Sequence, residues 1–145
     1  MSSRGFTLIE LLVVLAVLTL VIAVAAPFFS NALPGIELKG AARDVAAGLR
    51  SARGQAVRSN REAAFTLDVA ARRFAVSGRD QVRELPDELD ISFVTARSER
   101  LDETTGVIRF FPDGSSTGGR VSLARGARKY HVDVDWLTGR ISIRD

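Results

Sequence analysis

The chain has 145 residues, and its 20 basic and 17 acidic side chains give a formal net charge of +3. It contains no cysteine, which excludes disulfide bonds and thiolate metal sites. Of the charged residues only Arg4 and Glu10 precede Ser30, so residues 30–145 predict one small soluble domain. A net charge this small does not by itself indicate a nucleic-acid partner.

The chain starts with a short polar stub that leads directly into an apolar segment. Between Phe6 and Phe29 a single charged residue, Glu10, interrupts the apolar run. As a helix this segment would extend about 36 Å, enough to cross a hydrocarbon core of roughly 30 Å. Arg4 precedes it and the next basic residue is Lys39, which orients the start of the chain toward the cytoplasm. The segment therefore predicts a transmembrane helix with the rest of the chain outside.

Glu10 is a functional candidate because of its position in that segment. A charged side chain at membrane depth costs roughly 2.5–3.5 kcal/mol on insertion scales, so it requires a compensating partner. Its position in the first turn of the helix adds a smaller favourable interaction with the helix dipole.

Two simpler interpretations of the N-terminus are a secretory signal peptide and a plain membrane anchor. For the signal peptide, Arg4 supplies the charged region, Leu11 to Ile22 the apolar region, and Ala23 to Ala25 a small-residue cleavage pattern. Under that interpretation the mature chain would be a soluble periplasmic enzyme. Glu10 near the head of the apolar run, and apolar sequence that continues through Pro27 to Phe29, argue against both interpretations.

After Phe29 the pattern remains helical to about residue 60. Basic residues such as Lys39 and Arg43 lie off an apolar stripe, so the stripe predicts a helix face that packs on a sheet. Pro34 and Gly35 predict a kinked or partly melted stretch. The stripe consists of Leu38, Ala42, Val45, Leu49, Ala52 and Ala56.

From Ala63 onward the apolar period changes to two, which is typical of antiparallel strands. Turns at residues 70–72 and at Thr138-Gly139 predict hairpins, and Trp136 is expected on the same face as Val134. The predicted fold class is α+β, with a long N-terminal helix and an antiparallel sheet that wraps its C-terminal half. The expected strands are residues 65–69, 74–76, 89–94, 107–111, 121–123, 130–136 and 141–143.

The string PDGSSTGG at residues 112–119 lacks the lysine and the spacing of a phosphate-binding loop, so it predicts a turn and an exposed, mobile loop. Asp133 and Asp135 alternate on a strand with His131, the only histidine of the chain, which is too few ligands for zinc. Their expected environment is a solvated strand face. No nucleophile motif is present either, so the sequence predicts no enzyme activity, no cofactor and no metal site.

The string GFTLIE at Gly5 to Glu10, followed by LLVVLAVL, resembles the prepilin signal of type IV pilins and of type II secretion pseudopilins. The resemblance implies cleavage between Gly5 and Phe6 by a prepilin peptidase, N-methylation of Phe6, and retention of the apolar helix. It divides the chain into a leader at residues 1–5, a transmembrane helix segment at 6–29, an amphipathic continuation at 30–60 and a periplasmic β-sheet domain at 61–145.

The strings FFPDGSSTGG and LTGRISI resemble the C-terminal domain of H-type minor pseudopilins of the type II secretion system. This resemblance implies a pilin-like fold and a structural role in a pseudopilus that helps export folded proteins. The implied partners are other minor pseudopilins, the major pseudopilin, the prepilin peptidase and the inner membrane. The implied location is the cell inner membrane, single-pass, with the C-terminal domain in the periplasm.

Cleavage after Gly5 would create an amino group four residues before Glu10. In a staggered stack of helices the Glu10 carboxylate of one subunit can then neutralise the amino terminus of its neighbour. Removal of one partner of a buried ion pair typically costs about 3–5 kcal/mol. Glu10 is therefore predicted to set the register of assembly.

The alternative function is that of a minor type IV pilin that contacts DNA during uptake. Residues 120–145 contain six basic and three acidic side chains, a local excess of +3. Arg140 and Arg144 are the candidate phosphate contacts by resemblance alone, although Ile141 to Ile143 separate them more widely than in a tighter arginine motif. The competing interpretation is a solvated basic sheet edge that discourages aggregation.

Overall fold

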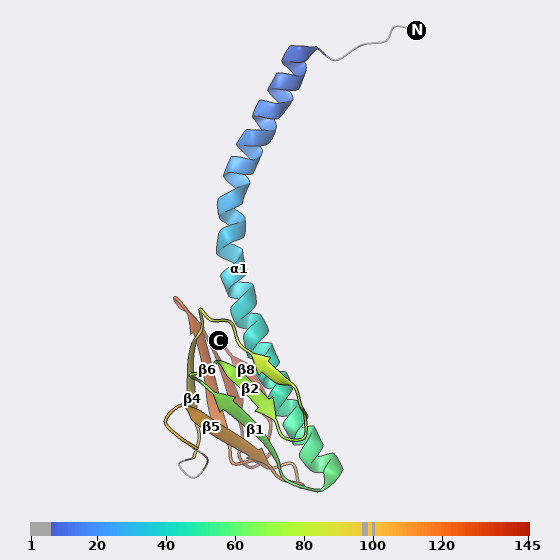
Figure 1. Cartoon of the computed structure of the whole chain (residues 1–145), viewed down its shortest axis with the longest axis vertical. Helices are drawn as coiled ribbons and strands as arrows, with labels where there is room; N and C mark the ends of the chain where they lie inside the picture. The colour runs from blue at the N-terminus through green and yellow to red at the C-terminus, as the bar shows by residue number, and fades with distance from the viewer. Residues whose placement is uncertain (1–6, 97–98, 100) are drawn as a thin grey trace, which may run out of the picture. The chain divides into compact units, whose positions relative to one another are not determined.

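The computed structural model describes residues 7–96, 99 and 101–145, with the backbone alone for residues 25–34. The chain divides into two compact units, Met1–Pro34 and Gly35–Asp145. Helix α1 (Leu8–Ser59) begins in the first unit and ends in the second, and the strands β1 to β8 all belong to the second unit (Figure 1).

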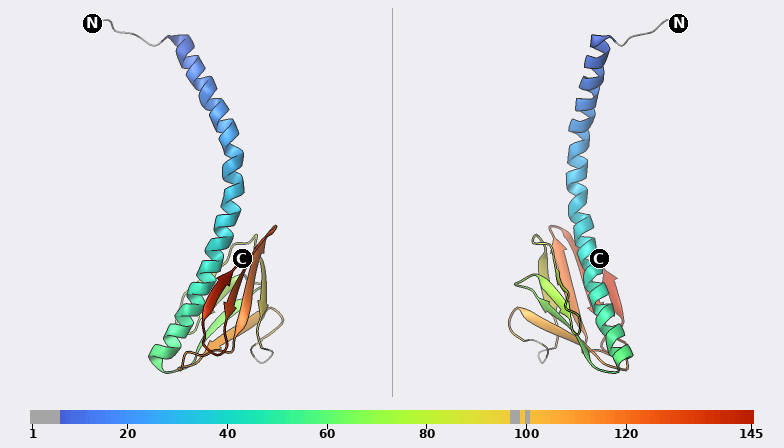
Figure 2. Two further views of the ribbon diagram at one scale, coloured as in Figure 1. Left: turned by 180° about the vertical axis from the view of Figure 1, so that it is seen from behind. Right: turned by 45° about the vertical axis from the view of Figure 1, so that its right-hand side comes forward.

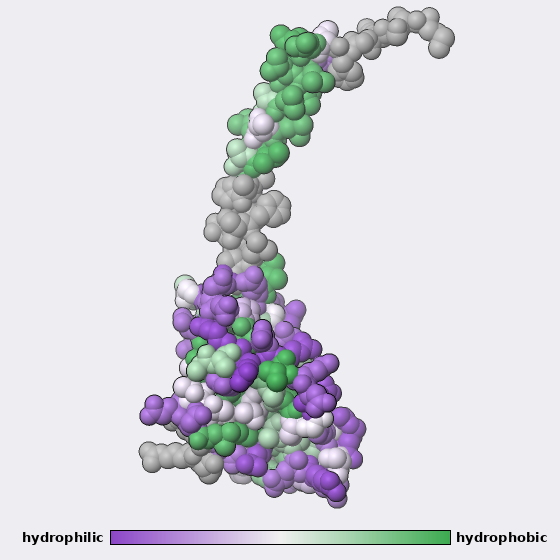
Figure 3. Space-filling model, in the orientation of Figure 1, coloured by the Kyte–Doolittle hydropathy of each residue, from purple (hydrophilic) through white to green (hydrophobic). Residues whose placement is uncertain are grey.

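The first unit is a helix whose described side chains are largely apolar and exposed. Leu8 is 82% exposed, and the large apolar side chains from Ile9 to Val24 are also exposed, as the hydrophobic colouring in Figure 3 shows. Among the described residues, no helical stretch is both long and apolar enough to cross a membrane. The predicted transmembrane segment 6–29 includes Phe6 and the side chains of residues 25–29, which lie outside those described.

The melted stretch predicted near Pro34 is wrong, because α1 is helical without interruption from Leu8 to Ser59. A proline inside a helix removes one backbone hydrogen bond and crowds one carbonyl.

In the second unit the predicted apolar stripe of α1 is confirmed. Its six members are all fully buried and belong to one hydrophobic cluster together with the inward residues of the strands. Small side chains such as Ala42 and Ala52 let the helix approach the sheets closely, while Lys39 and Arg43 are exposed. Figure 2 shows this part of α1, coloured teal to green, along the strands.

The strands form two antiparallel sheets, which corrects the prediction of one sheet. Sheet A has the order β3-β2-β1-β5 and sheet B the order β4-β6-β7-β8. The strands are β1 (Ala63–Asp68), β2 (Arg73–Val76), β3 (Val82–Glu84), β4 (Asp90–Val94), β5 (Thr105–Phe110), β6 (Gly119–Arg125), β7 (Arg128–Val134) and β8 (Ile141–Arg144).

The two sheets separate between β4 and β5, which do not pair with each other in the described ladders. The ring of Phe93 on β4 instead covers Gly106 on β5, where an added Cβ would lie 1.9 Å from the ring. The Thr95 hydroxyl donates a hydrogen bond to the carbonyl of Val107 (3.0 Å). Side-chain packing therefore replaces the ladder at this seam, and alternation in the sequence gives no sign of it.

Two further differences concern the strands themselves. β3 was not predicted, because all three of its side chains are exposed and show no alternation. Trp136 was predicted on the same face as Val134, which is 6% exposed, but Trp136 itself is 66% exposed. β7 ends at Val134, and the chain then turns at Asp135, so the alternation does not extend to Trp136. The hairpin turn at Thr138-Gly139 is confirmed by the pairing of β7 with β8.

Gly48 lies on the helix face that packs against two aromatic rings of sheet A. A Cβ at this position would lie 2.7 Å from the ring of Phe74 and 3.0 Å from that of Phe65, and these two rings stack with centroids 5.1 Å apart. Gly40, on the same helix, has no atom within 4 Å of an added Cβ. The two glycines therefore allow the same substitution to be compared at a crowded and at an open position of one helix.

We predict that Gly48→Ala and Gly40→Ala change stability in opposite directions. Alanine gains about 0.8–1.0 kcal/mol of helix propensity over glycine, so Gly40→Ala should stabilise by up to about that amount. Gly48→Ala should destabilise by about 1–3 kcal/mol, because the added methyl overpacks the aromatic pair. Urea unfolding of the fragment from Gly35, followed by circular dichroism, measures both. A stabilised Gly48→Ala variant would contradict the close packing.

Candidate assembly and binding sites

The N-terminus of α1 is fixed by a cap at Thr7. The backbone N–H of Glu10 donates to both the carbonyl oxygen (3.1 Å) and the hydroxyl oxygen (3.4 Å) of Thr7, and the N–H of Leu11 donates to the same carbonyl (3.3 Å). Thr7 and Glu10 therefore occupy the first and fourth positions of the capping-box pattern, threonine followed three residues later by glutamate. This role of Thr7 was not predicted, although the threonine and glutamate spacing of residues 7–10 is a signal for it.

Glu10 differs from the other polar side chains of its segment. Thr7 accepts a hydrogen bond from Glu10, and the Thr19 hydroxyl donates to the carbonyls of Leu15 (3.0 Å) and Ala16 (2.8 Å). Of the three polar side chains in described residues 7–24, those of Thr7, Glu10 and Thr19, only the carboxylate of Glu10 makes no hydrogen bond or ion pair. Gly5 and Phe6, the predicted processing residues, lie outside the described residues.

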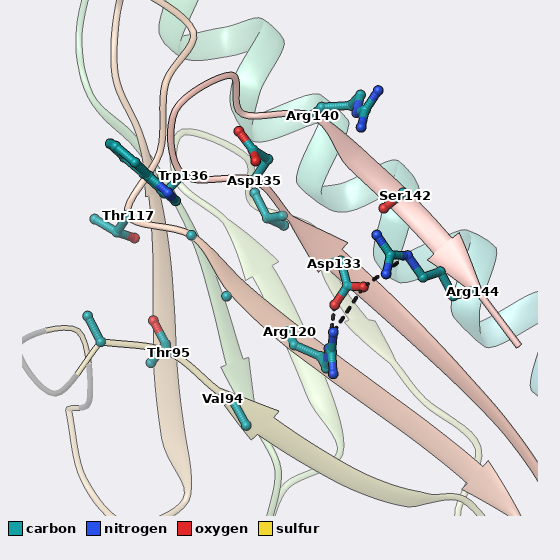
Figure 4. A pocket seen from close by; sticks show the side chains of 14 residues that line it. Val94, Thr95, Thr117, Arg120, Asp133, Asp135, Trp136, Arg140, Ser142 and Arg144 are labelled. Atoms are coloured by element: carbon teal, nitrogen blue, oxygen red, sulfur yellow. Dashed lines mark hydrogen bonds and ion pairs between the residues drawn. The ribbon is translucent and has the colours of Figure 1, made fainter.

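Arg140 and Arg144, the candidate phosphate contacts, lie at the C-terminal hairpin of the second unit. Both line a hollow of about 590 Å³, which we call the sheet-B groove (Figure 4). The Arg144 guanidinium lies 3.5 Å from the Asp133 carboxylate, whereas the Arg140 side chain points away from Asp133. The groove is lined by Val94 to Ala96, Thr117 to Arg120, Asp133 to Trp136, Arg140, Ser142 and Arg144.

Asp133 is an internal counterion in this groove and not half of a catalytic carboxylate pair. Its carboxylate accepts two hydrogen bonds from the guanidinium of Arg120, one of them 3.2 Å long from Nη2, and lies 3.5 Å from Nε of Arg144. Asp133 and Arg120 are cross-strand partners on β7 and β6, which explains the alignment. The positive charge of Arg144 is thereby partly compensated within the chain.

Asp135 caps the turn that joins β7 to β8. Its Oδ1 accepts hydrogen bonds from the backbone N–H and the hydroxyl of Thr138, both at 2.8 Å. These bonds stabilise the carboxylate and lower the pKa of Asp135 below its ordinary value, with a smaller contribution from Arg140. His131 makes a different contact, through Nδ1 to the hydroxyl of Ser122 (2.8 Å). No group of three potential metal ligands lies together among the described residues.

The loop at residues 112–119 is held in place, which corrects the prediction of an exposed, mobile loop. Ser116 is only 5% exposed; its N–H donates to the carbonyl of Trp136 (2.8 Å) and its hydroxyl to that of Asp135 (3.0 Å). Arg53 of α1 donates to the carbonyls of Gly114 and Thr138, each at 3.1 Å. Small polar residues in a sequence suggest mobility, but these same groups serve here as bonding partners for the adjacent turn.

Gly139 shows how closely the turn and the loop approach each other. Its φ of +61° suits the left-handed region, and an added Cβ would lie 2.0 Å from the carbonyl oxygen of Gly114. The helix, the loop and the β7–β8 turn of the second unit thus form one bonded junction at the end of the sheet-B groove.

Two solved structures resemble about three quarters of this chain and define the class of fold. The type IV minor pilin FimU of Pseudomonas aeruginosa matches with a TM-score of 0.60 and 14% identity, over 77% of this chain and 91% of that one. The minor pseudopilin EpsH of Vibrio cholerae matches with a TM-score of 0.59 and 15% identity, over 74% of this chain and 96% of that one. The fold is therefore pilin-like.

Sequence comparison identifies the family. Residues 41–138 match the family described as type II transport protein GspH, and residues 1–26 match the prokaryotic N-terminal methylation motif. The type II secretion system protein H of Xanthomonas campestris pv. campestris is 36% identical over 138 residues, which cover 95% of this chain and 81% of that protein. The chain belongs to the GspH family of type II transport proteins.

Family membership confirms the resemblance drawn from the sequence motifs. The chain is a minor pseudopilin of the type II secretion system, a structural component of the cell envelope and not an enzyme, and as such it interacts with other pseudopilins. The roles of Glu10, Gly5, Phe6, Arg140 and Arg144 stay predictions.

We predict an acid limb of stability that depends on Asp135. Its folded pKa is depressed, so its contribution is present above the unfolded pKa of about 3.9 and is lost as the pH falls through the folded pKa. Asp135→Asn keeps an acceptor for Thr138 without the titration. Urea midpoints measured from about pH 6 down to about pH 2 should fall less steeply for this variant than for the unsubstituted chain. If the urea midpoints of the two proteins fell equally with decreasing pH, the capping role of Asp135 would be contradicted.

Proposed function

We propose that the chain is anchored in the cell inner membrane by residues 6–29 and assembles through an ion pair between Glu10 and the amino terminus of a neighbouring subunit. In this arrangement the second unit lies in the periplasm, and the apolar helix packs against the helices of other pseudopilins. The single observation that carries the proposal is the Glu10 carboxylate, which lacks a partner among the described residues of its helix.

The physical argument starts from the desolvation of that carboxylate. The surrounding side chains, such as Ile9 and Leu11, are apolar and exposed on the single chain, so they become buried in lipid or against other helices. A lone carboxylate in such surroundings is costly, whereas a paired one is tolerated. The Thr7 cap holds Glu10 in the first turn, so the carboxylate occupies a defined height along the helix.

The countercharge comes from processing of the leader, residues 1–5. Cleavage between Gly5 and Phe6 by a prepilin peptidase would free an amino group, which N-methylation of Phe6 leaves positively charged. The match of residues 1–26 to the N-terminal methylation motif supports this step. Other minor pseudopilins and the major pseudopilin carry the complementary site under this proposal.

We predict that Glu10→Gln leaves membrane insertion and processing intact but weakens co-assembly. Loss of one partner of a buried ion pair costs about 3–5 kcal/mol, so crosslinking to partner pseudopilins should fall at least about tenfold. The measurement is site-specific crosslinking in membranes that contain the co-expressed pseudopilins.

Thr19→Val is the matched control for that experiment. It changes a polar side chain of the same apolar segment whose hydroxyl bonds only to its own helix, so crosslinking should stay at the level of the unsubstituted chain. Full crosslinking by Glu10→Gln, or an equal loss in Thr19→Val, would argue against the ion pair.

We predict that the mature protein begins at Phe6 with a methylated amino group. Mass measurement and N-terminal sequencing of protein purified from membranes test this directly. A start at Ala26 would identify a secretory signal peptide, and a retained Met1 a plain anchor. Either result would overturn the assembly proposal, because neither supplies the amino group next to Glu10.

A further inference from the structure

The sheet-B groove carries an exposed aromatic side chain beside a cluster of arginines. Trp136 is 66% exposed at one end of the groove and Val94 is 65% exposed along it. Arg120 and Arg144 lie farther along and converge on Asp133 (Figure 4). An exposed tryptophan close to arginines is the composition that dominates binding energy at protein interfaces.

Trp136 is exposed but its backbone is fixed. Its carbonyl accepts the hydrogen bond from the Ser116 N–H, and the neighbouring carbonyl of Asp135 accepts one from the Ser116 hydroxyl. Gly118 brings the loop close underneath, because a Cβ at that position would lie 3.0 Å from Cβ of Trp136. The loop at residues 112–119 therefore holds the backbone that carries the indole, and little backbone entropy remains to be lost on binding.

Both aspartates of the groove already accept hydrogen bonds, whereas Arg120 and Arg144 keep unused donors. Asp133 is occupied by Arg120 and Arg144, and Oδ1 of Asp135 by Thr138. A guanidinium carries five N–H donors, and Asp133 engages Nε and Nη2 of Arg120 and Nε of Arg144. The remaining donors of these two arginines can accommodate further acceptors of negative charge.

We propose that the sheet-B groove binds an acidic segment of a partner protein. An apolar side chain of that segment packs on Trp136 and Val94, and its carboxylates pair with Arg120 and Arg144. The lining residues all belong to the second unit, so the inference does not depend on the role proposed for Glu10.

Charge favours a protein segment over a nucleic acid as the occupant. The three arginines of the groove, Arg120, Arg140 and Arg144, lie with two aspartates, so the local excess is only +1. Affinity for nucleic acid grows with the number of phosphates neutralised, and two carboxylates in the groove oppose a polyanion. A peptide with a few carboxylates and an apolar side chain matches both the small charge and the exposed indole.

The test uses the full chain in detergent micelles and a fluorescence signal that reports on the groove. Trp136 is the only tryptophan of the chain, so its emission reports on this site alone. The probe is a short synthetic peptide in which glutamate alternates with phenylalanine. Saturable binding with a blue-shifted emission is expected, and the same peptide with lysine in place of glutamate should not bind.

Calorimetry with variants localises the binding. Trp136→Ala should weaken peptide binding at least about tenfold, as for a central interface residue, and Trp136→Phe should restore much of it. Arg144→Gln should weaken it about threefold or more. Leu137→Ala, an equally exposed neighbour outside the groove, and Arg83→Gln, whose pair with Asp44 (3.7 Å) resembles that of Arg144, should bind within about twofold of the unsubstituted chain.

Three results would overturn the proposal. The first is no saturable binding of the glutamate peptide. The second is equal loss of binding in Trp136→Ala and Leu137→Ala, which would place the peptide elsewhere. The third is tighter binding of a single-stranded oligothymidylate than of the peptide with the same dependence on Trp136 and Arg144, which would assign the groove to nucleic acid.

Discussion

The second unit depends on one contact, the close packing of a helix face of small side chains on two sheets. Gly48 on α1 leaves room for the rings of Phe65 and Phe74, and Leu38, Val45 and Leu49 are fully buried in the same hydrophobic cluster. Because interiors tolerate little change in volume, this face fixes how near each sheet lies to the helix. Arg53 of the helix donates hydrogen bonds to the loop at Gly114 and to the turn at Thr138, so the positions of both depend on the same contact.

Sequence patterns predicted those parts of the fold in which the burial of each side chain follows directly from its hydrophobicity. The stripe of α1 and the alternation in β1, β2 and β7 follow directly from burial on one side, and the structure bears them out. The division into two sheets was not predictable in this way. It depends on Phe93 covering Gly106, a contact between strands whose own patterns are compatible with one sheet.

The candidate sites show the same limit. Glu10 could be found because a carboxylate in an apolar run conflicts with its surroundings. The sheet-B groove could not be found, because Asp133 and Asp135 look alike in the sequence although one pairs with arginines and the other caps a turn. Trp136 was predicted on the face of Val134 for a similar reason: alternation continues through it, whereas the strand ends two residues earlier. The turn at Asp135 explains both why Asp135 differs from Asp133 and why Trp136 is exposed.

The two candidate sites have different physical requirements. Glu10 requires removal from water, since an ion pair gains strength where the dielectric is low and apolar neighbours exclude solvent. The sheet-B groove requires the opposite, because its arginines remain exposed and their pairing with Asp133 contributes little to stability in water. A bonded loop that holds an exposed tryptophan beside such arginines gives no evident gain to the folded chain alone. That arrangement is understandable if the groove meets a partner, because an exposed indole on a fixed backbone then contributes binding energy that the isolated subunit does not use.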